Sequence, residues 1–381
     1  MTSVSLSRST TLLRPGSPAR RRVLLSVGAI LLVLMLAIHA GVRQGLLLAI
    51  GLGLGATLEG LRFGFAGPWR QAILNQDTRG LRAQLLSIAL AAVMMFPLLG
   101  QASGELIGAA APLGVAMVLG AFVFGAAMQV VLGCGSGTLV NAGSGNLTGL
   151  WVLPFFVAGS FLGTLHLPEW SLLGSLPPVV ISHELGTAGG LMVTAGGLLG
   201  LVLVLRHRAA PDEQRIPLRL WKAAGLLAVL ATLNLLVSGQ PWGVVYGLGL
   251  WGAKLAHWSG VELSGFAFWD APGNAGRLAE SLLLDVTSVT NLGILLGAGL
   301  ATRWKGEFAP QVTLTPRLWI AGAGAGLLLG YASRLAYGCN VGAFFSGIAS
   351  GSLHGWVWFA SAFAGSWVGV RLRNRLVGEV P

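Results

Sequence analysis

Charged residues are scarce in this chain of 381 residues: they make up 10% of it, whereas hydrophobic residues make up 54%. A soluble domain of this composition would lack the polar surface needed to cover its core, which excludes a water-soluble fold. Cysteine is also rare, because the chain contains only Cys134 and Cys339. Their wide separation excludes a disulfide framework and a clustered zinc site, although a single disulfide between them stays open. A Walker-type loop is absent, which argues against direct coupling to ATP.

Most of the chain consists of long apolar runs. They cover about residues 23–39, 45–58, 83–99, 111–132, 147–165 and 188–205, and the second half continues in the same way. Runs of about 17 to 25 residues are long enough to cross the hydrocarbon core of a bilayer. The 58 glycines lie mostly inside these runs, where small residues permit close helix approach and broken helices. We therefore predict an all-α polytopic membrane protein.

The net charge of +11 does not indicate a nucleic-acid partner, because the arginines are scattered between apolar runs and at both tails. Positive residues at the cytoplasmic ends of helices explain this distribution, and they place both termini in the cytoplasm. The bilayer is the expected partner. Arg20–Arg22 lead directly into a full-length apolar run without a cleavage site, so we expect the first helix to be retained.

The polar segments divide the chain into five regions. Residues 1–22 are expected to form a disordered basic cytoplasmic tail, 23–205 a first transmembrane half, 206–222 a cytoplasmic linker, 223–373 a second transmembrane half, and 374–381 a short tail.

The two halves share an ordered set of motifs. Gly133-Cys134-Gly135-Ser136-Gly137 is matched by Gly338-Cys339-Asn340-Val341-Gly342, and a tryptophan follows each cysteine at the same distance. Gly159-Ser160 is likewise matched by Gly365-Ser366. The arginine distribution favours inverted repeats, provided that one segment between residues 237 and 276 does not span. The interrupted stretch 62–70 is predicted to be a re-entrant or interfacial piece, and the Gly-Cys loops of both repeats are expected to meet near mid-membrane.

The two Gly-Cys loops are the predicted substrate site. A glycine-rich turn at a helix terminus offers backbone N–H donors to a small anion, and a thiol adds a weak, polarizable donor. The candidate residues are Cys134, Cys339, Gly133, Gly135, Gly338, Asn340, Gly342 and, in the interrupted segment, Gly64. Two plainer interpretations stay open: each cysteine is a small buried hydrophobe, or the glycines only allow helices to cross closely.

Other polar residues are weaker candidates. Asp285 begins an apolar run and is a possible intramembrane acid, and His354 and Trp356 suit packing as well as they suit a pathway. We expect no catalytic residue, metal or cofactor.

Residues 330–371 carry a recognisable signature: Gly338-Cys339-Asn340, Phe344-Phe345-Ser346-Gly347, Ser352-Leu353-His354-Gly355-Trp356 and Gly365-Ser366-Trp367-Val368-Gly369. This region closely resembles the YeeE/YedE family of bacterial inner-membrane transporters. The resemblance implies an hourglass-shaped helical fold with short re-entrant helices and central cysteines. It also implies import of a small sulfur or selenium solute such as thiosulfate, and in some genomes a soluble sulfur-carrier partner resembling TusA. The family often has a cysteine where this chain has Gly64, which puts the exact substrate in question.

Three functions remain after these exclusions. The first is a permease for a small sulfur- or selenium-containing solute, and it is the one we favour. The second is a membrane sulfur-transfer component that uses a persulfidated cysteine, which would need a stabilising base or cation beside the thiol. The third, a scaffold for a soluble partner, would need a long cytoplasmic domain that this chain lacks.

Overall fold

The computed structural model describes residues 17–102, 104–306 and 315–377. The predicted tails therefore lie largely outside the described residues, although α1 already begins at Pro18 and the last helix continues to Val377. The first half contains α1 (Pro18–Ala40), α2 (Val42–Gly60), α3 (Ala66–Asn75), α4 (Arg79–Gln101), α5 (Val115–Val131), α6 (Gly135–Gly143), α7 (Leu147–Leu165), α8 (Leu167–Ser171) and α9 (Ile181–His207). Two short strands, β1 (Leu113–Gly114) and β2 (Ser175–Leu176), pair antiparallel with Leu113 opposite Leu176.

The second half follows the 3₁₀ turn η2 (Pro211–Glu213). It contains α10 (Leu218–Ser238), α11 (Val245–Trp258), α12 (Ala267–Asp270), α13 (Pro272–Ala279), α14 (Val286–Lys305), α15 (Pro316–Leu335), the π-helix η3 (Asn340–Phe345), α16 (Ser346–Ala349) and α17 (Leu353–Val377). Among the described residues, seven helical stretches are long and apolar enough to cross a membrane. This confirms the prediction of an all-α, multi-pass membrane protein.

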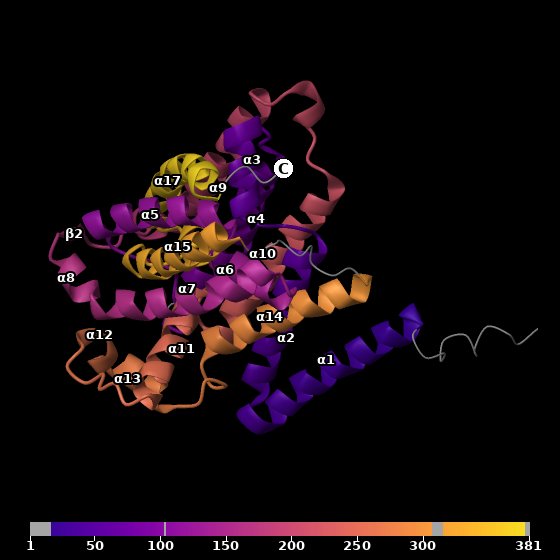
Figure 1. Cartoon of the computed structure of the whole chain (residues 1–381). Helices are drawn as coiled ribbons and strands as arrows, with labels where there is room; N and C mark the ends of the chain where they lie inside the picture. The colour runs from indigo at the N-terminus through magenta and orange to yellow at the C-terminus, as the bar shows by residue number, and fades with distance from the viewer. Residues whose placement is uncertain (1–16, 103, 307–314, 378–381) are drawn as a thin grey trace, which may run out of the picture.

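Four long helices, α17, α5, α15 and α7, lie side by side in this order on one side of the molecule (Figure 1). Glycines bring their backbones into direct contact at two crossings. A Cβ at any of these glycines would overlap a carbonyl oxygen of the facing helix: the pairs are Gly125 with Ala362 and Gly365 with Phe122 between α5 and α17, and Gly159 with Leu327 and Gly330 with Phe156 between α7 and α15. At these four positions, glycine therefore allows two helices to cross closely.

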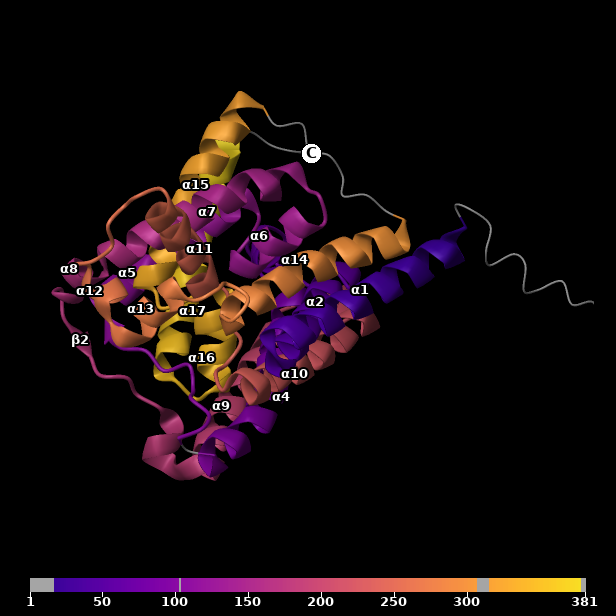
Figure 2. The ribbon, with the colours of Figure 1, turned by 90° about the horizontal axis from the view of Figure 1, so that it is seen from below.

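Helices α2, α14, α10, α4 and α9 form the other side, and α1 lies along α2 and α14 at the edge (Figure 2). The α2–α14 crossing again depends on glycine, since a Cβ at Gly55 or Gly297 would overlap the backbone of the facing helix. Most side chains of α1 are exposed, and of its 23 residues only Leu36 is buried. Its apolar surface is suited to lipid contact.

The linker between the halves is fixed to α4 by arginines. Arg82 is fully buried and donates to the backbone carbonyl oxygens of Glu213 and Gln214. Arg79 forms a salt bridge of 2.8 Å with Asp77 and a second of 3.6 Å with Glu213. The hydrogen bond from Arg79 lowers the pKa of Asp77 below its usual range, which keeps this carboxylate ionised. The polar segment thus packs against the end of the helical body where α4 begins.

Candidate functional site

Both cysteines cap the first turn of a short helix. Cys134 precedes α6, and its Sγ accepts a hydrogen bond from the backbone N–H of Gly137 at 3.4 Å. Cys339 precedes η3, and its Sγ accepts from the N–H of Val341 at 3.5 Å. The free N–H groups of a helix's first turn are normally capped by serine, threonine, aspartate or asparagine. A thiol sulfur accepts hydrogen bonds more weakly than the oxygen of these side chains, so the N–H groups are bound less tightly than in an ordinary helix cap.

The two Gly-Cys loops meet, as the duplicated motif predicted. A Cβ at Gly135 would lie 2.9 Å from the Sγ of Cys339 and 3.5 Å from a methyl carbon of Val244. Cys339 is therefore packed directly on the loop that carries Cys134. Only glycine at position 135 permits this approach. Residues distant in the sequence are thereby joined at one point inside the helical body.

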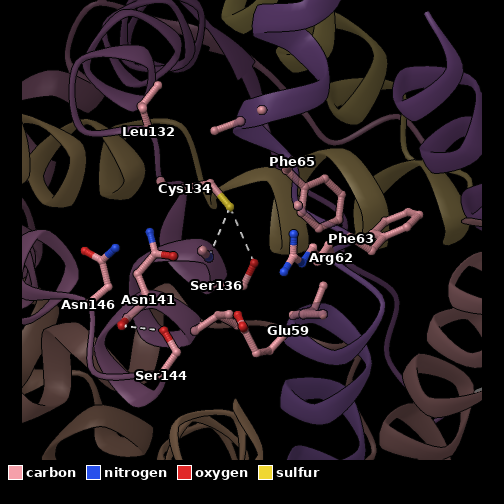
Figure 3. Close-up of a pocket in the computed structure, with 17 residues that line it drawn as sticks. Glu59, Arg62, Phe63, Phe65, Leu132, Cys134, Ser136, Asn141, Ser144 and Asn146 are labelled. Atoms are coloured by element: carbon pink, nitrogen blue, oxygen red, sulfur yellow. Dashed lines mark hydrogen bonds between the residues drawn. The ribbon is translucent and has the colours of Figure 1, made fainter. Parts of the chain in front are cut away.

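A cavity of about 310 Å³ opens on the Cys134 side of this contact. Figure 3 shows the thiol of Cys134 pointing into it, with Phe63 and Phe65 on the facing wall. The predicted residues Gly133 and Gly64 also line the cavity, whereas Cys339 and Asn340 are fully buried beyond it. The hydroxyl of Ser136 lies 3.4 Å from the Cys134 thiol, within hydrogen-bonding distance.

Gly64 occupies open space. A Cβ at this position would meet no atom within 4 Å, and Gly64 is not among the residues with positive φ. Its carbonyl oxygen accepts a hydrogen bond of 2.8 Å from the side-chain amide of Gln84, which fixes the backbone beside the cavity. The backbone conformation therefore does not require glycine here.

Gly338 differs from Gly64 because its φ is 151° and a Cβ would lie 2.7 Å from the backbone nitrogen of Ala343. Glycine is needed at position 338 for the turn itself. Gly342 has no neighbour within 4 Å of an added Cβ and is not constrained in this way. The side-chain amide of Asn340 is fully buried, and both of its polar atoms lack a hydrogen-bond partner within the described ranges.

The weaker candidates have structural partners. Asp285 caps α14 and accepts a hydrogen bond of 2.7 Å from the N–H of Ser288. His354 is buried and shares a 2.7 Å hydrogen bond with the hydroxyl of Ser352. Trp356 packs against the position of Gly197. None of the three residues lines the cavity beside Cys134, although Asp285 lines a separate polar pocket and its Oδ1 has no hydrogen-bond partner among the described residues.

Sequence reasoning missed several polar residues of the cavity wall. Ser136, Asn141 and Asn146 contribute hydroxyl and amide groups, and Arg62 and Glu59 lie on the opposite wall (Figure 3). The spacing of Gly137 and Asn141 was the available signal, because both lie on α6 and residues four apart share a face of a helix. Helix α6 therefore presents a mostly small and polar face to the cavity.

The family model described as sulphur transport matches residues 62–368. The chain belongs to this family. The match covers most of the cavity wall, both Gly-Cys loops and the reciprocal glycine crossings, and it confirms the resemblance to YeeE/YedE proteins.

Individual relatives align with this chain at low sequence identity. The chain is 26% identical to the thiosulfate transporter TsuA of Spirochaeta thermophila over 336 residues, which cover 84% of this chain and 96% of the relative. It is 23% identical to the thiosulfate transporter TsuA of Escherichia coli over 322 residues, 82% of this chain and 90% of that protein. The probable transporter YedE of Salmonella typhimurium is 26% identical over 153 residues, 40% of this chain and 37% of the relative.

Proposed function

We propose that this protein is a permease that imports a small sulfur-containing anion such as thiosulfate, with a related selenium solute as the chemical alternative. The observation that carries the proposal is the Cys134 thiol. It points into a cavity whose wall includes the first turn of α6, and the second Gly-Cys loop is packed behind it. Membership of the sulphur transport family and the relatives named thiosulfate transporter support the same substrate class.

The chemistry of the loops suits a transient anion site. An anion that leaves water needs hydrogen-bond donors in its place, and the N–H groups of a helix's first turn supply them together with the positive end of the helix dipole. The thiols of Cys134 and Cys339 add weak donors that a sulfur atom can contact and leave. A lysine or arginine at the same point would hold the anion too strongly for release. Gly133, Gly135, Gly338, Gly342 and Asn340 would shape the two loops around this path.

An inverted repeat with re-entrant segments is part of this proposal. The crossings of α5 with α17 and of α7 with α15 use matching glycines, as expected if α5 corresponds to α15 and α7 to α17. The short helices α6 and η3 would then be the equivalent re-entrant pieces, each beginning at its cysteine. Broken helices of this kind are tolerated inside a membrane protein where they line a path.

The positive residues support an orientation with the cavity facing the cytoplasm. Lys305 donates to the carbonyl oxygen of Gly60 at 2.7 Å, and Arg219 donates to that of Leu61 at 3.0 Å. Both contacts are next to the cavity residues Glu59 and Arg62. Positive residues favour the cytoplasmic side, so we place the protein in the bacterial inner membrane with both termini in the cytoplasm. A TusA-like sulfur carrier would receive the solute at this face.

The persulfide alternative has less support from the geometry. Cys134 contacts the hydroxyl of Ser136 and a backbone N–H, and Cys339 contacts a backbone N–H. These hydrogen-bond partners are uncharged, whereas a reactive thiolate is normally stabilised by a cation or a base. We therefore propose transport without covalent chemistry.

Uptake of ³⁵S-thiosulfate by a bacterium that lacks its own sulfur importers tests the proposal. Expression of the wild-type chain should restore uptake and growth on thiosulfate as the sulfur source. Accumulation of sulfide or sulfite in isolated membranes, without uptake, would instead indicate an enzyme.

A further inference from the structure

A second polar pocket lies far from the cavity beside Cys134. It has a volume of about 190 Å³, and the charged residues that line it are two arginines and two acids, Arg43, Arg277, Glu280 and Asp285, beside Gln240. Arg43 and Glu59 are near opposite ends of α2, and Glu59 lines the first cavity. With a rise of about 1.5 Å per residue, the length of α2 separates the two spaces by roughly 25 Å. They therefore open at opposite ends of the helical body.

Residues 239–244, here named the Trp242 arm, connect the second pocket with the Gly-Cys loops. The arm begins after α10, and Gln240 lines the pocket. It ends with Val244, whose methyl group lies 3.5 Å from a Cβ built at Gly135, beside the Sγ of Cys339. The arm thus reaches from the second pocket to the point where the two loops meet.

The Trp242 arm has a counterpart in the first half of the chain. Residues 61–65 also join a long helix to a shorter one, and they run from Arg62 to Phe65 along the first cavity. In both places an aromatic residue precedes a glycine, Phe63-Gly64 and Trp242-Gly243. Added Cβ atoms at Gly64 and Gly243 would meet open space, with Pro241 O at 4.0 Å from Gly243 as the nearest atom.

The two arms are also held in the same way. The side-chain amide of Gln84 in α4 donates to the carbonyl oxygen of Gly64 at 2.8 Å and to that of Phe65, the counterpart of Val244, at 3.4 Å. Asn291 lies as far from the start of α14 as Gln84 lies from the start of α4. Its side-chain amide donates to the carbonyl oxygen of Val244 at 2.9 Å. Matching geometry at both arms indicates matching roles, and the first arm lines the proposed transport path.

Unpaired donors point to a ligand at the Trp242 arm. The side chain of Trp242 is fully buried, yet its indole N–H has no hydrogen-bond partner in the described part of the chain. A buried indole N–H normally finds a partner, because leaving it unpaired is destabilising. Asn340, directly after Cys339, has an amide that is buried and unpaired in the same way. The arm is nevertheless held firmly: the Trp242 carbonyl accepts from the Ser346 hydroxyl at 2.7 Å.

We propose that the Trp242 arm forms the second half of the transport path. In this proposal the anion passes between the second pocket and Cys339, and the Trp242 indole N–H and the Asn340 amide are hydrogen-bond donors that select it. The inference rests on the proposed function and deepens it, since it assigns a path and specificity residues on the side of Cys339 opposite the cavity. The substrate class is a small oxyanion with several acceptor atoms.

Trp242→Phe tests the indole, because it removes the N–H and keeps an aromatic ring beside Phe345. The expected result is an increase in the KM for thiosulfate of about tenfold, as for the loss of one hydrogen bond to a charged ligand. The melting temperature should stay unchanged or rise, since no protein partner of the N–H is lost. Trp269→Phe is the matched control: this buried indole donates to Thr164 at 2.9 Å, so its loss should lower the melting temperature and leave KM unchanged.

Gly243→Cys gives a second measurement if Trp242→Phe does not fold. A thiol-specific methanethiosulfonate reagent applied from the side of the second pocket should slow uptake by this variant at least fivefold more than it slows uptake by the wild type, which carries Cys134 and Cys339 and is treated in the same way. Wild-type KM in Trp242→Phe, or full uptake by modified Gly243→Cys, would overturn the proposal while the permease function stands. Absence of sulfur-anion uptake by the wild type would overturn both, so the two failures are distinguishable.

Discussion

Gly64→Cys is the substitution that tests the site most directly, because it restores the thiol that YeeE/YedE proteins often carry at this position. A Cβ would meet nothing within 4 Å, and Gly64 does not have a positive φ. Replacing such a glycine should stabilise the fold by about 0.4–1 kcal/mol, because the unfolded chain loses conformational freedom. We therefore expect the variant to melt no lower than the wild type.

The effect on transport follows from the position of Gly64 in the wall of the cavity that contains Cys134. An additional thiol donor facing the anion should contribute about 1 kcal/mol, which corresponds to roughly a fivefold change in relative affinity. We expect preference to shift toward thiosulfate over sulfite and selenium analogues by this factor. Gly64→Ser is the matched control, since it adds a hydroxyl of similar length without sulfur.

Competition uptake in cells and the melting temperature of purified protein measure the two effects separately. A less stable Gly64→Cys variant with wild-type selectivity would refute the reasoning, because it would mean that Gly64 serves the backbone alone. An equal shift with Gly64→Ser would show that any hydrogen-bond donor suffices and that sulfur is not recognised.

The remaining predictions concern the loops, the helix crossings and the topology. Cys134→Ala and Cys339→Ala should each lower thiosulfate uptake at least tenfold while changing the melting temperature little, as measured on the same preparations; a parallel loss of folded protein would indicate a packing role. Gly125→Ala should destabilise the protein by about 1–3 kcal/mol in thermal denaturation because its Cβ overlaps α17, whereas Gly196→Ala, which has open space, should be neutral or slightly stabilising. Labelling with impermeant reagents at tags on both tails and at Arg208 should place all three in the cytoplasm, and an external C-terminus would contradict the inverted repeat.

The fold class and the central contact could be predicted from the sequence because each depends on a repeated local pattern. Apolar run length indicated the helices, and the run 147–165 coincides with α7. The duplicated Gly-Cys motif predicted that the two loops meet, and the contact of Cys339 with Gly135 confirms this, whereas the equivalence of the two loops in a repeat stays a prediction. Their proposed role in binding substrate remains a prediction.

Other features depend on three-dimensional contacts that no local pattern specifies. The Trp242 arm contains no cysteine, and an aromatic residue before a glycine is too common a pattern to relate it to residues 61–65 without the contacts of Gln84 and Asn291. The helical geometry of residues 18–22 also differs from the disordered tail that their charge suggested, because Pro18 starts α1 and the hydroxyl of Ser17 caps it. The sequence shows that position 64 is glycine, but it does not show whether a side chain would have room there.

The glycine crossings also determine which motions are available for transport. Helix α5 of the first half contacts α15 and α17 of the second, and α7 contacts α15, with backbones touching at both crossings. In many transporters built from repeats, one half rocks against the other as a rigid body. Two halves interlocked in this way cannot move like that without separating these backbones. Gating is then left to the short segments at the centre, where Gly135, Cys339 and Val244 touch.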